Sequence, residues 1–127
     1  MLRKAAYVAT LLALTVSPAM AEGDAAKGEK VFRKCKACHV VDAEKNRVGP
    51  HLVGIIGRPA AHVEKFKYSK AMQAKAEEGL VWDEASIAEF LKAPKKYLKG
   101  TKMAFVGLKK QDDIDDVIAY IKAESGK

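Results

Sequence analysis

Hydrophobic and polar positions follow a helical spacing in three stretches of the chain. The first stretch follows Asp24 and places apolar or small residues on one face of a helix. These residues are Ala25, Gly28, Val31, Phe32 and Cys35. The Asp24 carboxylate is suited to cap this helix, because it can accept hydrogen bonds from free N–H groups in the first turn. The pattern therefore predicts an N-terminal helix that leads directly into two cysteines.

Two more apolar stripes lie toward the C-terminus. One begins at Asp83 and ends before Pro94, because a proline pushes the preceding residue out of the α-helical region. Its apolar positions are Ile87, Phe90 and Leu91. The other stripe has the i, i+3, i+4, i+7 spacing of a helix at Ile114, Val117, Ile118 and Ile121. Aspartates crowd its start, where the helix dipole favours negative charge, at Asp112, Asp113, Asp115 and Asp116.

Long turn-rich segments over residues 42–56 and 95–110 connect the helices, and a shorter fourth helix is predicted over residues 69–78. The sequence contains no convincing alternating strand pattern and no internal repeat. Loops of this length without regular structure are uncommon in a compact domain. We therefore expect an all-α fold of three to five short helices, whose long loops wrap a group that is not protein.

The first 21 residues have the three-part pattern of a secretory signal peptide. Arg3 and Lys4 precede a largely apolar stretch over residues 5–16, and small residues at Ala19 and Ala21 favour cleavage after Ala21. The apolar stretch is too short for a stable membrane span, although an uncleaved anchor is the alternative. We expect a cleaved signal peptide over residues 1–21, one domain over residues 22–127, and export to a bacterial periplasm.

The composition fits a single globular domain. The chain has 127 residues, of which 49% are hydrophobic and 31% are charged, and its formal net charge is +7. Two cysteines exclude a scaffold of several disulfides. No apolar run reaches the roughly 20 residues that a membrane-spanning helix needs, so we expect no stable membrane insertion. Nucleic-acid binding is not expected either, because the basic charge comes without a recognition motif.

The strongest chemical signal is a C-x-x-C-H motif at Cys35, Cys38 and His39. This motif is typical of covalent haem attachment. Two sulfurs three positions apart can reach the two vinyl groups of one haem, and the next residue can place an imidazole nitrogen over the iron. We therefore predict one haem c with thioether bonds to Cys35 and Cys38 and with His39 as an iron ligand.

Three other interpretations of the two cysteines remain. A disulfide between them would close a very small loop and stabilise the fold little. A thioredoxin-like redox pair requires a neighbouring strand–helix–strand pattern, which the sequence lacks. A zinc site requires further ligands, and the chain has no second C-x-x-C motif.

Four residues are candidates for the second iron ligand, namely Met72, Met103, His51 and His62. Met72 falls in the predicted fourth helix, where a packing role is expected. Met103 follows a loop that contains Gly100, where the backbone can direct a thioether inward. Ligation by methionine and histidine raises the haem potential, and a filled sixth position keeps oxygen from the iron. This favours electron transfer over catalysis.

Several motifs in one order resemble the class I cytochromes c, most closely the bacterial cytochrome c2 or c-550 type. The resemblance covers essentially all of residues 23–127. Besides Cys35 to His39, it rests on the runs Gly23-Asp24-Ala25-Ala26-Lys27-Gly28 through Phe32, Val48-Gly49-Pro50-His51-Leu52, Gly57-Arg58, Leu80-Val81-Trp82, Ala93-Pro94-Lys95-Lys96-Tyr97, Gly100-Thr101-Lys102-Met103-Ala104-Phe105 and Ile118-Ala119-Tyr120.

The resemblance implies further roles around the haem. His39 and Met103 would be the axial ligands, and the Pro50 carbonyl would orient the His39 imidazole. Arg58, Tyr68, Trp82 and Thr101 would lie near the haem propionates, and Phe105 beside the exposed edge of the ring. Gly28 would let the last helix, at Tyr120, pack closely on the first.

The chain departs from the family pattern at three places. Phe90 stands where a tyrosine is common, so a hydrogen bond from that position toward the methionine sulfur is lost. His51 replaces the usual asparagine after Gly49-Pro50, without an evident function. The segment over residues 69–81 is longer than in mitochondrial relatives, which leaves its haem contacts open.

Lysines flank the haem motifs, at Lys34, Lys36, Lys95, Lys96, Lys99, Lys102, Lys109 and Lys110. Such a run is either a solvated surface or a positive ring that guides an acidic partner toward the haem edge. We expect a monomeric electron carrier, not an enzyme, that meets its partners briefly. Its donor would be a quinol-oxidising complex or a dehydrogenase, and its acceptor an oxidase, a peroxidase or a photosynthetic reaction centre. A haem enzyme or gas sensor with an open sixth site, and a thiol redox protein, are the alternatives.

Overall fold

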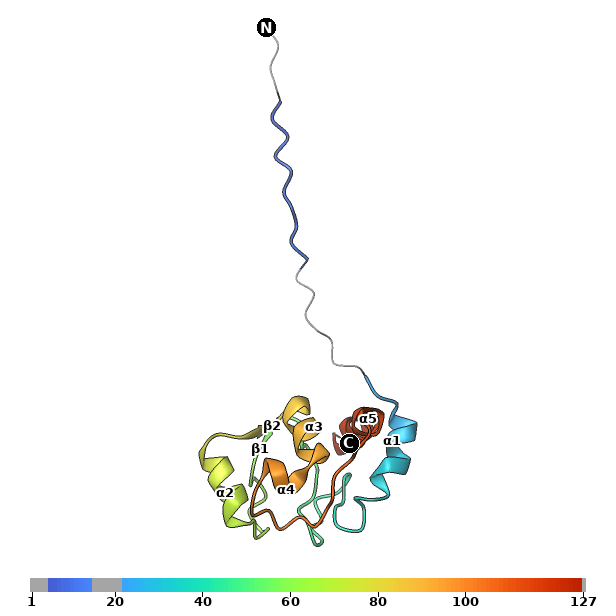
Figure 1. Ribbon diagram of the computed structural model, residues 1–127, viewed down its shortest axis with the longest axis vertical. Coiled ribbons are helices and arrows are strands. Elements are labelled where there is room, and N and C mark those ends of the chain that lie inside the picture. The colour runs from blue at the N-terminus through green and yellow to red at the C-terminus, as the bar shows by residue number, and fades with distance from the viewer. Residues whose placement is uncertain (1–4, 15–21, 127) are drawn as a thin grey trace.

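The computed structural model describes residues 5–14 and 22–126 (Figure 1). Within these ranges the chain forms five helices and one small sheet. In chain order the elements are α1 (Ala25–Phe32), β1 (Arg58–Pro59), α2 (Lys70–Glu77), β2 (Val81–Trp82), α3 (Glu84–Lys92), α4 (Pro94–Tyr97) and α5 (Gln111–Ser125). The predicted fold of short helices and long loops is confirmed.

Residues 5–14 carry no helix or strand, and their large apolar side chains are exposed, with Tyr7 96% and Leu11 91% accessible. The predicted cleavage site after Ala21 lies outside the described residues, so the signal peptide stays a prediction. No helix within the described ranges is both long and apolar enough to cross a bilayer.

Polar side chains cap three of the helices at their starts. The Asp24 carboxylate accepts from the backbone N–H of Ala26 at 2.9 Å and begins α1. Ser69 caps α2, and Asp83 caps α3 by accepting from the Ser86 N–H at 2.7 Å. These contacts satisfy N–H groups that have no partner inside the helix. Sequence patterns therefore placed these helix starts correctly.

Helices α1 and α5 cross at close range (Figure 1). Gly28 is buried in this contact, and a Cβ there would overlap the Asp116 carbonyl oxygen and lie 2.8 Å from the Tyr120 Cβ. The rings of Phe32 and Tyr120 pack beside this point at 5.2 Å between centroids. The close approach expected for Gly28 is confirmed.

The remaining core lies between α5, α3 and α4. Ile114 and Val117 of α5 are each only 1% exposed. Trp82 and Phe90 pack with their ring centroids 5.1 Å apart, and Tyr97 of α4 closes the aromatic cluster. Pro94 does more than end the preceding helix, because it occupies the first turn of α4, where its fixed φ suits a helix start.

The sequence pattern missed the small sheet. Strands β1 and β2 are antiparallel, and Arg58 is paired with Trp82. Two-residue strands are too short to show an alternating pattern, so their pairing depends on the surrounding fold. Flanking bonds from the Gly57 N–H to the Trp82 carbonyl and from the Ala60 N–H to the Leu80 carbonyl extend the contact. The sheet places Arg58 and Trp82 side by side, which matters for the site.

Candidate functional site

The cysteine and histidine side chains lie on consecutive turns directly after α1. The Cys35 N–H donates to the Phe32 carbonyl at 2.8 Å, and the His39 N–H donates to the Cys35 carbonyl at 2.9 Å. Both Cys35 and Cys38 are free thiols and are half-buried. The turns present two sulfurs and one imidazole within five residues of chain.

The His39 imidazole is held by the loop that faces it. Its Nδ1 lies 2.7 Å from the Pro50 carbonyl oxygen. Because a carbonyl can only accept, Nδ1 carries the proton, and Nε2 keeps its lone pair. Gly49 packs closely against the ring, and a Cβ at that position would overlap it. Burial lowers the pKa of His39. The Arg58 cation lowers it further, whereas the hydrogen bond to Pro50 raises it. His39 is therefore a neutral imidazole with Nε2 available to a metal.

The loop from Asn46 to Val53 is fastened to the cysteine motif by backbone and side-chain bonds. The Gly49 N–H donates to the Cys38 carbonyl at 2.9 Å. The Arg47 guanidinium donates to the Lys36 carbonyl at 3.2 Å. The Asn46 side chain accepts from the His51 N–H at 2.9 Å. Arg47 and Asn46 were not expected from the sequence, since neither residue belongs to a recognisable local pattern.

The environment of Cys35 argues against thiol redox chemistry. Burial raises the pKa of Cys35 to about 11, with the neighbouring Cys38 adding to the effect and Lys34 opposing it. Catalytic thiols require a lowered pKa, because the thiolate is the nucleophile. A zinc site is not favoured either, since no cluster of three His, Cys, Asp or Glu residues suited to a metal occurs within residues 5–14 and 22–126.

Arg58 is a buried cation with one unsatisfied donor. The residue is 8% exposed, and its Nη1 donates to the carbonyls of His51 and Val53 at 3.1 Å each. Its Nε is buried without a partner in the described part of the chain. Burial lowers the pKa of Arg58, and Tyr68 opposes this. A buried guanidinium with a free N–H fits an anionic group such as a haem carboxylate.

Tyr68 and Trp82 lie close to this cation in different ways. Trp82 is the β2 partner of Arg58 and is buried. The Tyr68 hydroxyl oxygen accepts from the Val63 N–H at 3.1 Å, which leaves its own proton free to be donated. Four residues were expected near the propionates. Three of them, Arg58, Tyr68 and Trp82, thus lie near one another in the structure.

The fourth, Thr101, belongs to the loop that carries Met103. The Thr101 hydroxyl oxygen accepts from the Met103 N–H at 3.2 Å, and Gly100 supplies a positive φ of 93° that turns the chain. Met103 and Phe105 are half-buried and pack against the core. Met72 of α2 also packs there, so burial alone does not distinguish the two methionines.

The two other histidines are placed differently from His39. His62 is exposed. His51 is half-buried, and its Nδ1 accepts a hydrogen bond from the Val53 N–H. Within the part of the chain that the structure describes, no hydrogen bond orients the His62 imidazole, and one ring nitrogen of His51 is already occupied.

Two free thiols and an oriented neutral imidazole lie within five residues of the chain, and the loop that holds the imidazole is bonded to a buried cation with a free N–H. The residues therefore fit the predicted cofactor. This defines the class as a c-type haem protein.

Comparison with known proteins agrees with this class. The model of the family "Cytochrome c" matches residues 25–125. Cytochrome c2 of Afifella marina is 52% identical over 98 residues, which are 76% of this chain and 79% of that protein. Cytochrome c2 of Agrobacterium tumefaciens (strain II Chrys) is 48% identical over 101 residues, covering 79% and 91%. The solved structure of cytochrome cH from Methylobacterium extorquens superposes with a TM-score of 0.72 at 45% identity, covering 80% and 99%.

The chain belongs to the cytochrome c family, and it is of the bacterial class I cytochrome c2 type. The family binds haem c covalently, and Cys35 and Cys38 supply the two thiols that such attachment requires. Its function is single-electron transport by one haem.

Proposed function

We propose that the protein is a periplasmic electron carrier whose haem is bound by Cys35 and Cys38 and ligated by His39 and Met103. The haem iron supplies one-electron exchange between its ferrous and ferric states. The observation that carries the proposal is the 2.7 Å bond between His39 Nδ1 and the Pro50 carbonyl oxygen. It fixes the tautomer and the direction of the imidazole before any metal is bound.

Met103 is the better candidate for the second ligand. Its loop has little regular structure, and Thr101 and Gly100 shape the turn that precedes it. Met72 instead lies on the α2 face that packs against the core. A methionine sulfur at the sixth position raises the potential and excludes small oxidants from the iron. This is the property that suits a carrier and not an enzyme.

Arg58, Tyr68, Trp82 and Thr101 would hold the haem carboxylates. Arg58 contributes a buried cation with a free Nε–H, and Tyr68 a free hydroxyl proton. Charge-assisted bonds of this kind are stronger than neutral ones. Pairing would also remove the cost of the buried unsatisfied donor on Arg58.

The surface beside Phe105 is suited to an acidic redox partner. Ala93, Lys95, Lys96, Ala104, Phe105 and Val106 line a shallow hollow of about 320 Å³ there. Phe105 and the 81% exposed Val106 give the hollow an apolar side, and Lys95 and Lys96 give it a basic side. The ion pairs within the described ranges involve Lys75, Lys92 and Lys122, which leaves Lys95 and Lys96 free to attract carboxylates.

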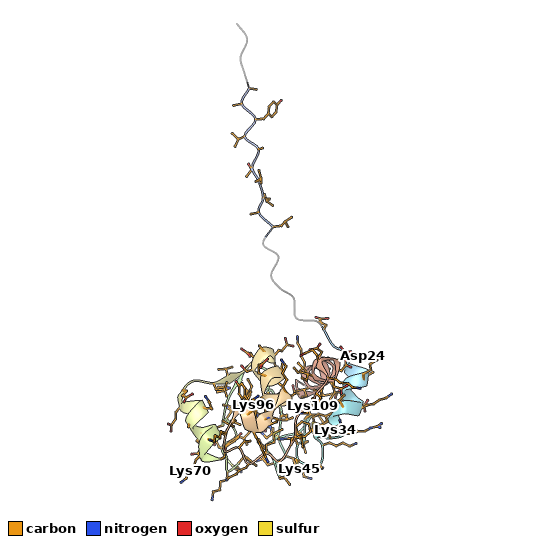
Figure 2. The ribbon with its side chains drawn as sticks, viewed as in Figure 1. Asp24, Lys34, Lys45, Lys70, Lys96 and Lys109 are labelled. Carbon is orange, nitrogen blue, oxygen red and sulfur yellow. The ribbon has the colours of Figure 1, made fainter. Side chains whose placement is uncertain are left out.

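Figure 2 shows Lys34, Lys96 and Lys109 across the middle of the domain and Asp24 at its upper right. Negative charge instead gathers at the first turn of α5, at Asp112 and Asp113. This uneven distribution would orient the molecule as it approaches a quinol-oxidising complex or dehydrogenase, and later an oxidase, peroxidase or reaction centre. The encounters would be brief and would weaken with added salt, as is typical of small redox interfaces.

The first experiment is the intact mass of the denatured protein, purified from the periplasm of a host that attaches haem. A mass equal to residues 22–127 plus one haem would establish export, cleavage after Ala21 and covalent attachment together. A chain of the same bounds without haem would remove the cytochrome assignment of Cys35 and Cys38 and favour a thiol pair.

Substitution of the two methionines separates the candidate ligands. Met103→Ala should lower the reduction potential sharply and allow the ferrous protein to bind carbon monoxide. Met72→Ala should change neither property. Equal potentials for Met103→Ala and the wild type would remove Met103 as a ligand. Rapid, complete carbon monoxide binding by the ferrous wild type would instead indicate an open site, as in a haem enzyme or gas sensor.

A further inference from the structure

The side chains of His51 and Arg58 bond to the same short turn over residues 51–53. The Val53 N–H donates to the His51 Nδ1 at 3.2 Å, and the Arg58 Nη1 donates to the carbonyls of His51 and Val53 at 3.1 Å each. The Asn46 side chain fixes the entry to the turn through the His51 N–H. The imidazole is thus part of the structure that holds Arg58.

The bond from Val53 defines the protonation state of His51. A backbone N–H can only donate, so Nδ1 must be an acceptor, and the imidazole is neutral with its proton on Nε2. Protonation of Nδ1 would turn this acceptor into a donor that faces another N–H. It would also add a positive charge to the turn that the Arg58 cation already holds.

Three charged or titratable side chains act on His51. Burial lowers the pKa of His51, and the Arg58 cation and His62 lower it further, while Glu44 opposes them. Arg58 belongs to β1, whereas Glu44 and His62 lie on the loops before and after that strand. A neutral imidazole is thus favoured near pH 7.

Arg58 connects this turn with the haem site. Its Nη1 holds the 51–53 turn, while its buried Nε has no partner in the described chain and is available to a haem carboxylate. A change in charge at the haem site, next to the Arg58 Nε, therefore affects the 51–53 turn and the His51 imidazole on the Nη1 side. This connection rests on the haem placement proposed above.

We propose that His51 is a redox-linked proton site, which binds a proton more strongly in the ferrous protein than in the ferric protein. Reduction of a bound ferric haem by the electron-donating partner would remove one positive charge from the site. A proton from solvent then adds to His51 Nδ1 at lower cost, and it displaces the Val53 N–H. Because linkage is reciprocal, a protonated His51 favours the ferrous state by the same free energy.

The pH dependence of the potential follows from this linkage. At low pH, His51 is protonated in both states, and the potential is highest. The potential falls as pH rises between the ferric and ferrous pKa values of His51, and it is constant above both. We expect proton binding to be at least about twofold tighter in the ferrous state, below the usual range of coupling because solvent and salt screen a half-buried group.

The test is an NMR titration of the wild-type holoprotein in both oxidation states, with dithionite or ferricyanide setting the state. We expect a higher pKa for His51 in the ferrous protein and a smaller difference for the exposed His62. Nitrogen-15 shifts should show the Nε2–H tautomer above the pKa. Equal pKa values of His51 in the two states would overturn the proposal, and so would the opposite tautomer.

A potentiometric titration of variants gives the second readout. His51→Asn retains an oxygen that can accept from the Val53 N–H but cannot bind a proton, so it should abolish the pH dependence assigned to His51. His62→Asn, the matched control, should retain it. If His51→Asn keeps the full wild-type dependence, the linked proton belongs to another group and the proposal fails.

The proposed function is tested separately. Loss of the methionine-ligated spectrum or of reversible reduction in the wild type would contradict it, and both are measured before any titration.

Discussion

At the crossing of α1 and α5, two helices touch through backbone because Gly28 has no side chain. In the loop over residues 46–58, by contrast, side chains of Asn46, His51 and Arg58 bond to backbone groups and define the path of the chain. The helix contact is stabilised mainly by burial of apolar area, which is large and has no preferred direction. The loop depends on bonds that are individually weak and strongly directional.

The two regions have different roles: the helix contact stabilises the fold, and the loop positions the side chains of the site. The α1–α5 contact joins the two ends of the folded region and depends on the close approach of the Gly28 backbone to Asp116 and Tyr120. The loop buries less but places the Pro50 carbonyl against His39 and Arg58 beside Trp82. We therefore expect substitutions at the crossing to change stability most, and substitutions in the loop to change the site more than the stability.

The largest effect is expected from Gly28→Ala. Its Cβ would overlap the Asp116 carbonyl, and a backbone group cannot turn aside as a flexible side chain can. The free energy of unfolding should fall by about 3 kcal/mol, because overpacking outweighs the better helix propensity of alanine. Denaturant unfolding followed by far-UV circular dichroism measures this, and Glu29→Ala, exposed on the same helix, is the control. A loss as small as that of the control would show that the crossing tolerates separation.

Removal of a single loop bond should have a smaller effect. Asn46→Ala deletes the acceptor for the His51 N–H and should cost about 1 kcal/mol, a typical value for one hydrogen bond. Asn46→Asp keeps an acceptor oxygen and should retain most of the stability. Equal losses in both variants would mean that this bond does not define the loop. Denaturant unfolding gives the energies, and amide exchange at His51 reports the bond itself.

Ala61 offers a gain in stability within the loop region. Its φ is +56°, the left-handed conformation that residues with a Cβ rarely adopt. Ala61→Gly should raise the free energy of unfolding by about 0.5 kcal/mol, since relief of strain exceeds the entropy that glycine adds to the unfolded chain. Ala60→Gly, buried and without a positive φ, is the matched control and should destabilise the protein. A loss of stability in both variants would contradict the assignment of strain.

The smallest effect is a pH dependence at the start of α3. Bonds from the backbone and side chain of Ser86 hold the pKa of Asp83 below its ordinary value of 3.8. The stabilisation is therefore complete above the unfolded pKa and is lost as pH falls through the lower, folded value. Asp83→Asn should be slightly less stable than the wild type at neutral pH, with the difference vanishing in strong acid. Thermal unfolding at several pH values checks this, and a constant difference would exclude a role for the carboxylate charge.

The two regions also differ in how far the sequence predicts them. Periodic apolar positions and the caps Asp24 and Asp83 located the helices, because these signals depend on local residues. The pairing of Arg58 with Trp82 and the bond from Arg47 to the Lys36 carbonyl could not be foreseen from spacing. They join residues whose proximity is created by the rest of the fold.

In the site, the motif at Cys35, Cys38 and His39 is recognisable because its geometry arises within five residues. The contact of His39 with Pro50 followed only from resemblance to a family, and the structure confirms it. Asn46 gave no signal, since an asparagine in a loop is common and its partner is a backbone N–H.

The position of the cysteine turns directly after α1 has a consequence for biogenesis. Cys35, Cys38 and His39 are neighbours in the chain, so they can be presented together before any distant part of the protein has folded. Met103 lies far along the chain, after α4, so under the proposed ligation it would reach the haem only after the intervening loops have closed. Haem attachment would thus require recognition of one short segment, whereas methionine ligation would serve as a signal that the maturation of the whole chain is complete.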